Sequence, residues 1–215
     1  MNRRRARYVA LEGIDGSGKS RLAAALARRY TRRGARVRLV HEPWDPTLGA
    51  IAQRKAPVDP FASAILFTLD RWLARPRLER ALRTADLVLT DRSFWSTIAY
   101  QGSELPQGPR QRLRELSARA VPAPDLVLWL RVPVAIALGR VAARRSRLGP
   151  LERHRRLERV ARAYQALARG RSWHTLDARR PFAEVVRAAE ARIDSMGIRG
   201  PPRLALHKRP ARRRT

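Results

Sequence analysis

Residues 13–20 read Gly13-Ile14-Asp15-Gly16-Ser17-Gly18-Lys19-Ser20, which fits the phosphate-binding loop pattern G-x-x-x-x-G-K-[ST]. Glycines let the backbone wrap closely enough for its N–H groups to surround phosphate oxygens. The lysine of such a loop pairs with the β and γ phosphates, and the serine hydroxyl is offered to Mg²⁺. The segment therefore predicts a site for a nucleoside triphosphate, with Ser20 as a magnesium ligand.

The residues on either side of this loop support the match. Residues 8–11 have the pattern of a buried strand, and residues 21–30 repeat apolar side chains at helical spacing before Gly34, a common helix stop. Of the 47 Lys and Arg residues only Lys19, Lys55 and Lys208 are lysines, so an arginine-rich chain keeps lysine where the loop needs it. A chance glycine-rich turn is the weaker interpretation.

Short apolar strands alternate with helical patterns along the rest of the chain, which is typical of an α/β fold with a parallel sheet. The predicted strands are 8–11, 37–40, 87–90, 126–130 and 173–176, and the predicted helices are 18–33, 60–84, 93–101, 109–120, 133–145, 151–170 and 182–196. We expect one domain over 8–197, a basic extension at 1–7 and a basic, disordered tail at 198–215.

Composition excludes several classes of site. The 215 residues contain no cysteine, which excludes disulfides and cysteine nucleophiles, and the four histidines are not paired at zinc-ligand spacing. No apolar run approaches the length of a membrane span and no secretory signal is evident, so we expect a cytoplasmic protein without membrane contact. The net charge of +29 would attract nucleic acid, but we expect only nonspecific binding through the basic tails.

Two residues that follow the third predicted strand suggest further chemistry at the same edge of the sheet, where ligands of such folds bind. Asp91 is a carboxylate after an apolar strand, which is the usual place for a second magnesium ligand opposite a phosphate-binding loop. Arg92 offers a planar, bidentate clamp for a phosphate. A simple ion pair at the strand end is the alternative.

Five stretches, in order along the chain, resemble the thymidylate kinases. They are residues 11–20, 66–72 (LFTLDRW), 91–102 (DRSFWSTIAYQG), 124–130 (PDLVLWL) and 176–182 (LDARRPF), and the similarity extends from about 8 to 195. The resemblance implies a P-loop NTPase fold with an Arg-rich lid at about 140–155. It also implies transfer of the γ-phosphoryl group of Mg·ATP to dTMP, giving dTDP and ADP, and a homodimer, since these enzymes are commonly dimeric.

The resemblance implies a role for each matching residue on the acceptor side. Phe67 would stack on thymine, Arg71 would bond a base carbonyl, and Asp15 would accept a hydrogen bond from the 3′-hydroxyl. Arg92 would hold the acceptor phosphate. Thr97 and Gln101 would reach toward the base edge, Tyr100 would lie against the sugar, and Glu42 is the remaining acceptor-side residue. Core packing is the alternative for the two aromatic residues.

The resemblance also implies which residues bind ATP. The resemblance assigns to ATP the loop Gly13, Ile14, Asp15, Gly16, Ser17, Gly18, Lys19 and Ser20, together with Arg140 and Arg179. Because positions 14–17 of the loop contain no basic residue, the catalytic lid arginine is expected among Arg144, Arg145 and Arg147, acting with Lys19 and Arg92.

Some residues depart from the family pattern and leave alternatives open. His41 replaces an arginine, Trp44-Asp45 replaces glycines, and Ser93 stands where the family has an aromatic residue or histidine. Ser93, together with Glu42-Pro43-Trp44, also resembles the corresponding stretches of deoxynucleoside kinases. In that interpretation, Glu42 would be the base that acts on a nucleoside 5′-hydroxyl. A third hypothesis is a non-kinase P-loop protein associated with nucleic acid.

Overall fold

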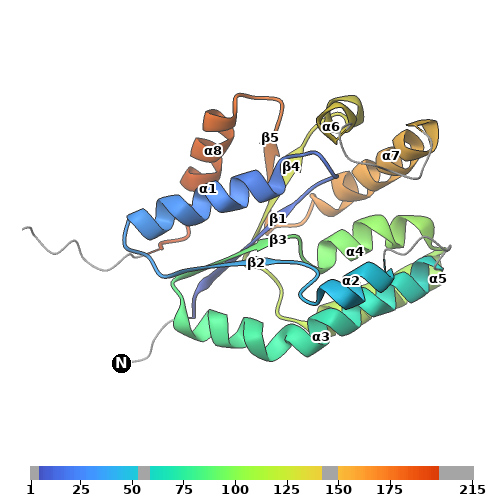
Figure 1. Cartoon of the computed structure of the whole chain (residues 1–215), viewed down its shortest axis with the longest axis horizontal. Coiled ribbons are helices and arrows are strands. Elements are labelled where there is room, and N and C mark those ends of the chain that lie inside the picture. The colour runs from blue at the N-terminus through green and yellow to red at the C-terminus, as the bar shows by residue number, and fades with distance from the viewer. Residues whose placement is uncertain (1–4, 53–58, 142–149, 199–215) are drawn as a thin grey trace, which may run out of the picture.

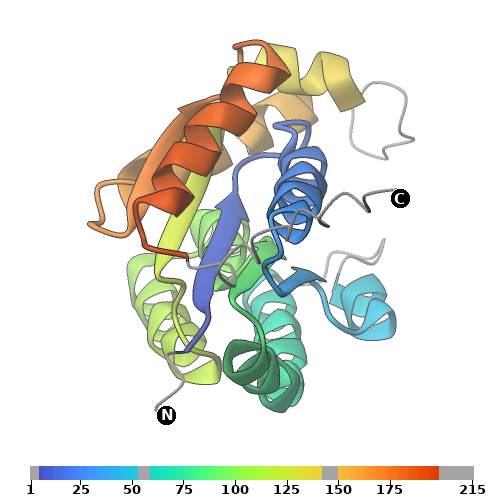
Figure 2. The same ribbon diagram turned by 90° about the vertical axis from the view of Figure 1, so that its left-hand side faces the viewer.

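The computed structural model describes residues 5–52, 59–141 and 150–198, and its centre is a twisted sheet (Figures 1 and 2). The strands are β1 (Arg7–Glu12), β2 (Val37–His41), β3 (Leu87–Asp91), β4 (Leu126–Arg131) and β5 (Trp173–Asp177). They lie in the order β2-β3-β1-β4-β5, and every pairing is parallel. The predicted five-stranded parallel sheet is confirmed, and each strand ends one residue later than predicted.

The apolar sequences of the inner strands explain why they form the centre of the sheet. All five residues of β3 and the first five of β4 are buried, as expected for parallel strands covered by helices on both faces. The outer strands β2 and β5 are less buried and each contains exposed residues. All five strands run toward the same edge, so the loops that follow them meet there.

Helices cover both faces of the sheet (Figures 1 and 2). On one face, α1 (Lys19–Arg32) packs Leu22 and Leu26 against Val9 and Leu11 of β1, and α8 (Phe182–Asp194) lies beside it. On the other face, α3 (Pro60–Thr84) packs Leu78 against Tyr8. The remaining helices on that face are α4 (Phe94–Tyr100), α5 (Gln107–Ala120) and α7 (Pro150–Leu167).

Every predicted helix is present, with ends that differ by up to four residues. The helix predicted at 133–145 is α6 (Val134–Val141), and its other predicted residues, at 142–145, lie outside the described part of the chain. Two short elements were not predicted, α2 (Pro46–Ala52) and the 3₁₀ turn η1 (Gly102–Glu104). Among the described residues, no helix has the length and apolar character that a membrane crossing requires.

The start of α3 shows how local sequence places a site element. The Asp59 side chain accepts hydrogen bonds from the backbone N–H groups of Phe61 and Ala62 at 2.8 and 3.0 Å, and Pro60 occupies the first helical position. Both are strong N-terminal signals, because they satisfy or remove donors that the first turn leaves unpaired. The fixed start brings residues 67–71 to the edge where the strands end.

Candidate active site

The phosphate-binding loop joins β1 to α1, as predicted. Gly13, Gly16 and Gly18 have φ values of 145°, 83° and 99°, which side chains rarely permit. Lys19 is buried, and its Nζ donates hydrogen bonds to the carbonyl oxygens of Gly13 and Ile14, each at 2.9 Å. Burial, and then the positive charge of Arg92, lower the pKa of Lys19 to about 8.

A cavity of about 840 Å³ lies over this loop and is lined by ten of the predicted residues. Its walls include Asp15, Gly16, Ser17, Gly18, Lys19, Ser20, Glu42, Asp91, Arg92 and Arg140. Arg180 and Phe182, which were not predicted, also line it. The volume is large enough for a nucleotide, since small-molecule sites span about 300–1,000 Å³.

Asp91 and Ser20 form a donor set that fits magnesium. Asp91 is buried at the end of β3, with one carboxylate oxygen 3.4 Å from Nδ1 of His41, and Ser20 lies exposed in the first turn of α1. Both line the cavity over the loop. One carboxylate and one hydroxyl leave the other positions to water and phosphate oxygens, as Mg²⁺ prefers. Within residues 5–52, 59–141 and 150–198, no cluster of three His, Asp or Glu forms a protein-only metal site.

Arg92 follows β3 in an unusual conformation and turns back over the loop. Its φ is 75°, the one positive value for a residue other than glycine among the described residues. The guanidinium forms an ion pair with Asp15, donates to Ser96 Oγ at 3.3 Å and lies 5.2 Å from the ring centre of Tyr100. Burial favours a raised pKa for the Asp15 carboxyl, but Arg92 and then Lys19 outweigh it and lower the pKa. Both partners are therefore charged at neutral pH.

Three predicted acceptor-side residues meet around a fourth, Arg71, whose side chain is only 3% exposed. Its Nε donates to Glu42 at 2.8 Å, its Nη1 to the Phe67 carbonyl at 3.3 Å, and its Nη2 to Thr97 Oγ1 at 2.8 Å. A further bond from Nη2 reaches the Ser93 carbonyl at 3.3 Å. A guanidinium has five N–H donors. Among the described residues, these four bonds leave one Nη1 donor of Arg71 without a partner.

The other acceptor-side predictions are placed less closely together. Tyr100 lies beside the loop, where its hydroxyl accepts a hydrogen bond from the Asp15 N–H at 2.9 Å. Gln101 follows α4 as its C-terminal cap and is half-buried. Glu42 is buried by its contact with Arg71; burial raises its pKa, and Arg71 opposes that rise. Arg144, Arg145 and Arg147 lie outside the described residues.

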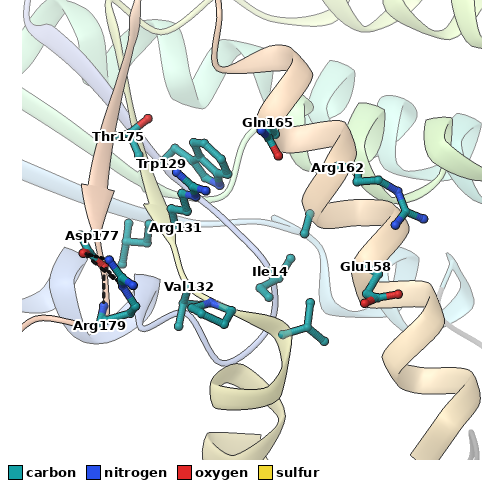
Figure 3. Close-up of a pocket in the computed structure, with 14 residues that line it drawn as sticks. Ile14, Trp129, Arg131, Val132, Glu158, Arg162, Gln165, Thr175, Asp177 and Arg179 are labelled. Carbon is teal, nitrogen blue, oxygen red and sulfur yellow. Dashed lines mark hydrogen bonds and ion pairs between the residues drawn. The ribbon is translucent and has the colours of Figure 1, made fainter.

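Arg179 lies in a different cavity from the one over the phosphate-binding loop. This second cavity, of about 500 Å³, is bounded by β4, β5 and α7, with Ile14 on one wall (Figure 3). Hydrogen bonds from Arg179 hold the pKa of Asp177 well below its usual range. The structure instead places Arg180 beside Arg140, whose Nη2 donates to the Ala178 carbonyl at 3.0 Å.

Two buried carboxylates in the site were missed by sequence reasoning. Asp70 accepts hydrogen bonds from the N–H groups of Trp44 and Asp45, at 2.8 and 2.7 Å, and so fixes the loop that follows β2. Glu12 is completely buried at the end of β1. The sequence contained a signal for both residues. Glu12 stands at the end of an apolar strand, and Asp70 stands beside Arg71 on a helix. A carboxylate at such a position needs several donors.

Comparison with known proteins finds the same family by two routes, a family model and individual relatives. The family model described as thymidylate kinase matches residues 11–189. A probable thymidylate kinase of Archaeoglobus fulgidus is 34% identical over 190 residues, covering 87% of this chain and 94% of that protein. The thymidylate kinases of Prochlorococcus marinus and Leifsonia xyli subsp. xyli are 37% and 35% identical, over 87% of this chain and 93% and 94% of their own lengths.

Proposed function

Because this chain belongs to the thymidylate kinase family, we propose that it transfers the γ-phosphoryl group of Mg·ATP to dTMP, giving dTDP and ADP. One observation supports this reaction above the others. The phosphate-binding loop, the Asp15–Arg92 pair and the buried Arg71 all lie at the same edge of the sheet. A donor site and an acceptor site are thus next to each other, as an in-line transfer requires.

On the donor side, we assign the triphosphate to residues 13–20. Lys19 would exchange its bonds with two loop carbonyls for bonds with the β and γ phosphates. Arg140, Arg180 and Phe182 line the same cavity, and we assign them to the nucleoside end of ATP. Bound magnesium, held by Ser20 and Asp91, would neutralise charge on the phosphates.

On the acceptor side, Arg71 suits thymine better than cytosine. Its one remaining N–H can donate to a ring carbonyl, whereas the amino group of cytosine would place a donor against a donor. Phe67, whose carbonyl is bonded to Arg71, would stack on the base. Thr97 and Gln101 would reach the base edge, and Tyr100 would lie against the sugar.

Arg92 and Asp15 complete the acceptor site in this proposal. Arg92 would bind the phosphate of dTMP, and Asp15 would accept a hydrogen bond from the 3′-hydroxyl. The acceptor is already an anion at neutral pH, so the transfer needs charge stabilisation and exclusion of water more than a general base. We assign the additional stabilising charge to one of Arg144, Arg145 and Arg147.

The rival kinase reaction has less support. A deoxynucleoside kinase would need Glu42 free to take a proton from a 5′-hydroxyl, but its carboxylate is bonded to Arg71 at 2.8 Å and its side chain is 5% exposed. A non-kinase role in nucleic-acid binding would leave the magnesium and acceptor residues without a purpose. We therefore keep nucleic acid as a nonspecific partner of the basic ends.

We also propose a homodimer formed through α3. Four apolar side chains on α3 form what we call the α3 stripe: Ile65, Leu69, Trp72 and Leu73, which are 38–63% exposed. They recur at helical spacing and so share one face of the helix. Copies with a net charge of +29 repel each other, so an uncharged face is the one suited to self-association. The same stripe on a second copy, related by a two-fold axis, would cover it.

The direct test of the reaction is formation of dTDP from dTMP and Mg·ATP, separated by anion-exchange chromatography, in the wild type and Lys19→Ala. We expect dTDP from the wild type and none above background from the variant, with an unchanged circular dichroism spectrum. Near-normal turnover by Lys19→Ala would contradict the assignment of the donor site.

A further inference from the structure

Glu12 is a buried carboxylate that the reaction described above does not use. It is the last residue of β1, directly before the phosphate-binding loop, and its exposed fraction is 0%. Its Oε1 accepts bonds from the N–H and hydroxyl of Ser93, at 2.8 and 2.7 Å. Its Oε2 accepts bonds from Ser96 Oγ at 2.6 Å and from the Tyr164 hydroxyl at 2.8 Å. Four donors of this kind compensate a buried negative charge.

These bonds fix both the backbone and the guanidinium group of Arg92. At the backbone, Arg92 N–H donates to the Leu11 carbonyl at 3.0 Å, and the next N–H, of Ser93, donates to Glu12. This pair of bonds to β1 fixes the turn in which Arg92 has a φ of 75°. Such a conformation persists only where its surroundings determine it. At the side chain, the Arg92 guanidinium donates to Ser96 Oγ, which itself donates to Glu12.

We propose that Glu12 is a positioning residue that aims Arg92 at the phosphate of the acceptor nucleotide. The proposal rests on the acceptor role of Arg92 given above. Glu12 does not touch the ligand in this account, because it is buried beneath Ser93 and Ser96 and lines neither of the cavities described above. Through Tyr164, the same carboxylate also connects α7 to the turn that carries Arg92.

Glu12→Gln tests this role because it keeps the shape of the side chain and removes its charge. One amide oxygen can still accept from Ser93, but the amide nitrogen would face two hydroxyls that now donate to Oε2. We expect the dissociation constant of dTMP, measured by calorimetry, to rise at least about tenfold. Thymidine lacks the phosphate that Arg92 would bind, so its dissociation constant should change less than about twofold.

A matched control is available in Glu190, which is also a buried glutamate. It is paired with Arg29 and Arg33 between α8 and α1 at 2.6 and 3.0 Å, outside the cavity over the phosphate-binding loop. Glu190→Gln should leave both dissociation constants unchanged. A similar loss of dTMP binding in both variants would assign the effect to general destabilisation and overturn the proposal.

Ser96→Ala gives a second test if Glu12→Gln does not fold. It removes the hydroxyl between Arg92 and Glu12, and we expect weaker binding of dTMP with thymidine unaffected. Ser117→Ala is its control, because Ser117 is equally buried and its hydroxyl has no partner among the described residues. Equal losses for dTMP and thymidine, or no loss for either, would overturn the positioning role. If the wild type binds neither ligand, the proposed function itself fails.

Discussion

At the scale of single residues, each cation of the site is held by partners from the chain itself. Lys19 bonds to the carbonyls of its own loop, Arg92 pairs with Asp15, and Arg71 pairs with Glu42. Hydrogen bonds to these partners offset part of the cost of burying each cation. In the proposed reaction, nucleotide phosphates would replace some of these partners.

Lys19 gives a prediction on pH. Its pKa of about 8 means that it loses its charge as the pH rises through that value, whereas an ordinary lysine stays charged to about pH 10. The affinity for ATP should therefore fall above pH 8, by up to about tenfold per pH unit. Calorimetric titration with ATP in EDTA, between pH 6.5 and 9.5, measures this without a metal ion near the lysine.

The control for that titration is Lys19→Arg. Arginine keeps its charge throughout this range, so the decline above pH 8 should be absent in the variant, whatever its absolute affinity. A wild-type affinity that stays constant from pH 7 to 9.5 would contradict the lowered pKa of Lys19.

At the scale of elements, sequence patterns were sufficient for the strands and long helices and insufficient for the short ones. Buried parallel strands have continuous apolar sequences, and α3 has its cap and proline at 59–60. The seven-residue α2 depends on contacts that sequence does not show. Asp45 caps it through Thr47 and Leu48, and Asp45 is itself positioned by Asp70 of α3.

The same limit applies to the site. Residues within a recognisable motif, such as Lys19 and Asp91, could be placed from sequence because the motif fixes the end of a strand or the start of a helix. Glu12 could not be assigned a role, since its partners come from three other places in the fold: the turn after β3, α4 and α7. The resemblance assigned Arg179 to ATP, but Arg180 is the one that lines the cavity over the phosphate-binding loop; which of two adjacent residues does so depends on the direction in which a loop turns.

The contact between the phosphate-binding loop and α6 leads to a second prediction. A Cβ added to Gly16 would lie 2.2 Å from the Ala137 carbonyl oxygen and 2.7 Å from a Val141 methyl group, at a φ of 83°. Gly16→Ala should therefore push α6 from the loop and weaken ATP binding by at least about tenfold, measured by calorimetry.

Gly139→Ala is the matched control within α6. A Cβ at Gly139 meets no atom within 4 Å, and alanine is favoured over glycine in a helix by about 0.5–1 kcal/mol. We expect unchanged ATP binding and a slightly higher midpoint of thermal unfolding. Equal ATP affinity in the Gly16 and Gly139 variants would show that the close contact with α6 has no role in binding.

At the scale of the whole molecule, the proposed donor and acceptor sites lie at one edge of the sheet, and the α3 stripe lies on a helix that also carries Arg71. Phe67 and Arg71 stand between the residues of that stripe along the helix. Self-association through α3 would therefore stabilise the helix that carries Phe67 and Arg71, the residues that we assign to the base. Dimer formation and acceptor recognition depend on the same helix in this account.

The dimer is tested by Trp72→Glu, which places a charge in the centre of the α3 stripe, where the native side chain is 55% exposed. We expect sedimentation equilibrium to give twice the chain mass for the wild type and a single chain mass for the variant. Ile136→Glu is the control, because Ile136 is an apolar residue of α6 that is 41% exposed and lies outside the stripe. A wild type that is monomeric at all concentrations would refute the dimer.

The assignment of the acceptor is tested most directly by ADP release from Mg·ATP with dTMP, dCMP, thymidine and deoxycytidine as separate acceptors, in the wild type and Arg71→Ala. We expect a clear preference of the wild type for dTMP. We also expect the KM for dTMP to rise at least about tenfold in Arg71→Ala, while the KM for ATP changes by less than about twofold. Turnover of the nucleosides but not of dTMP would contradict the account and favour Glu42 as a catalytic base.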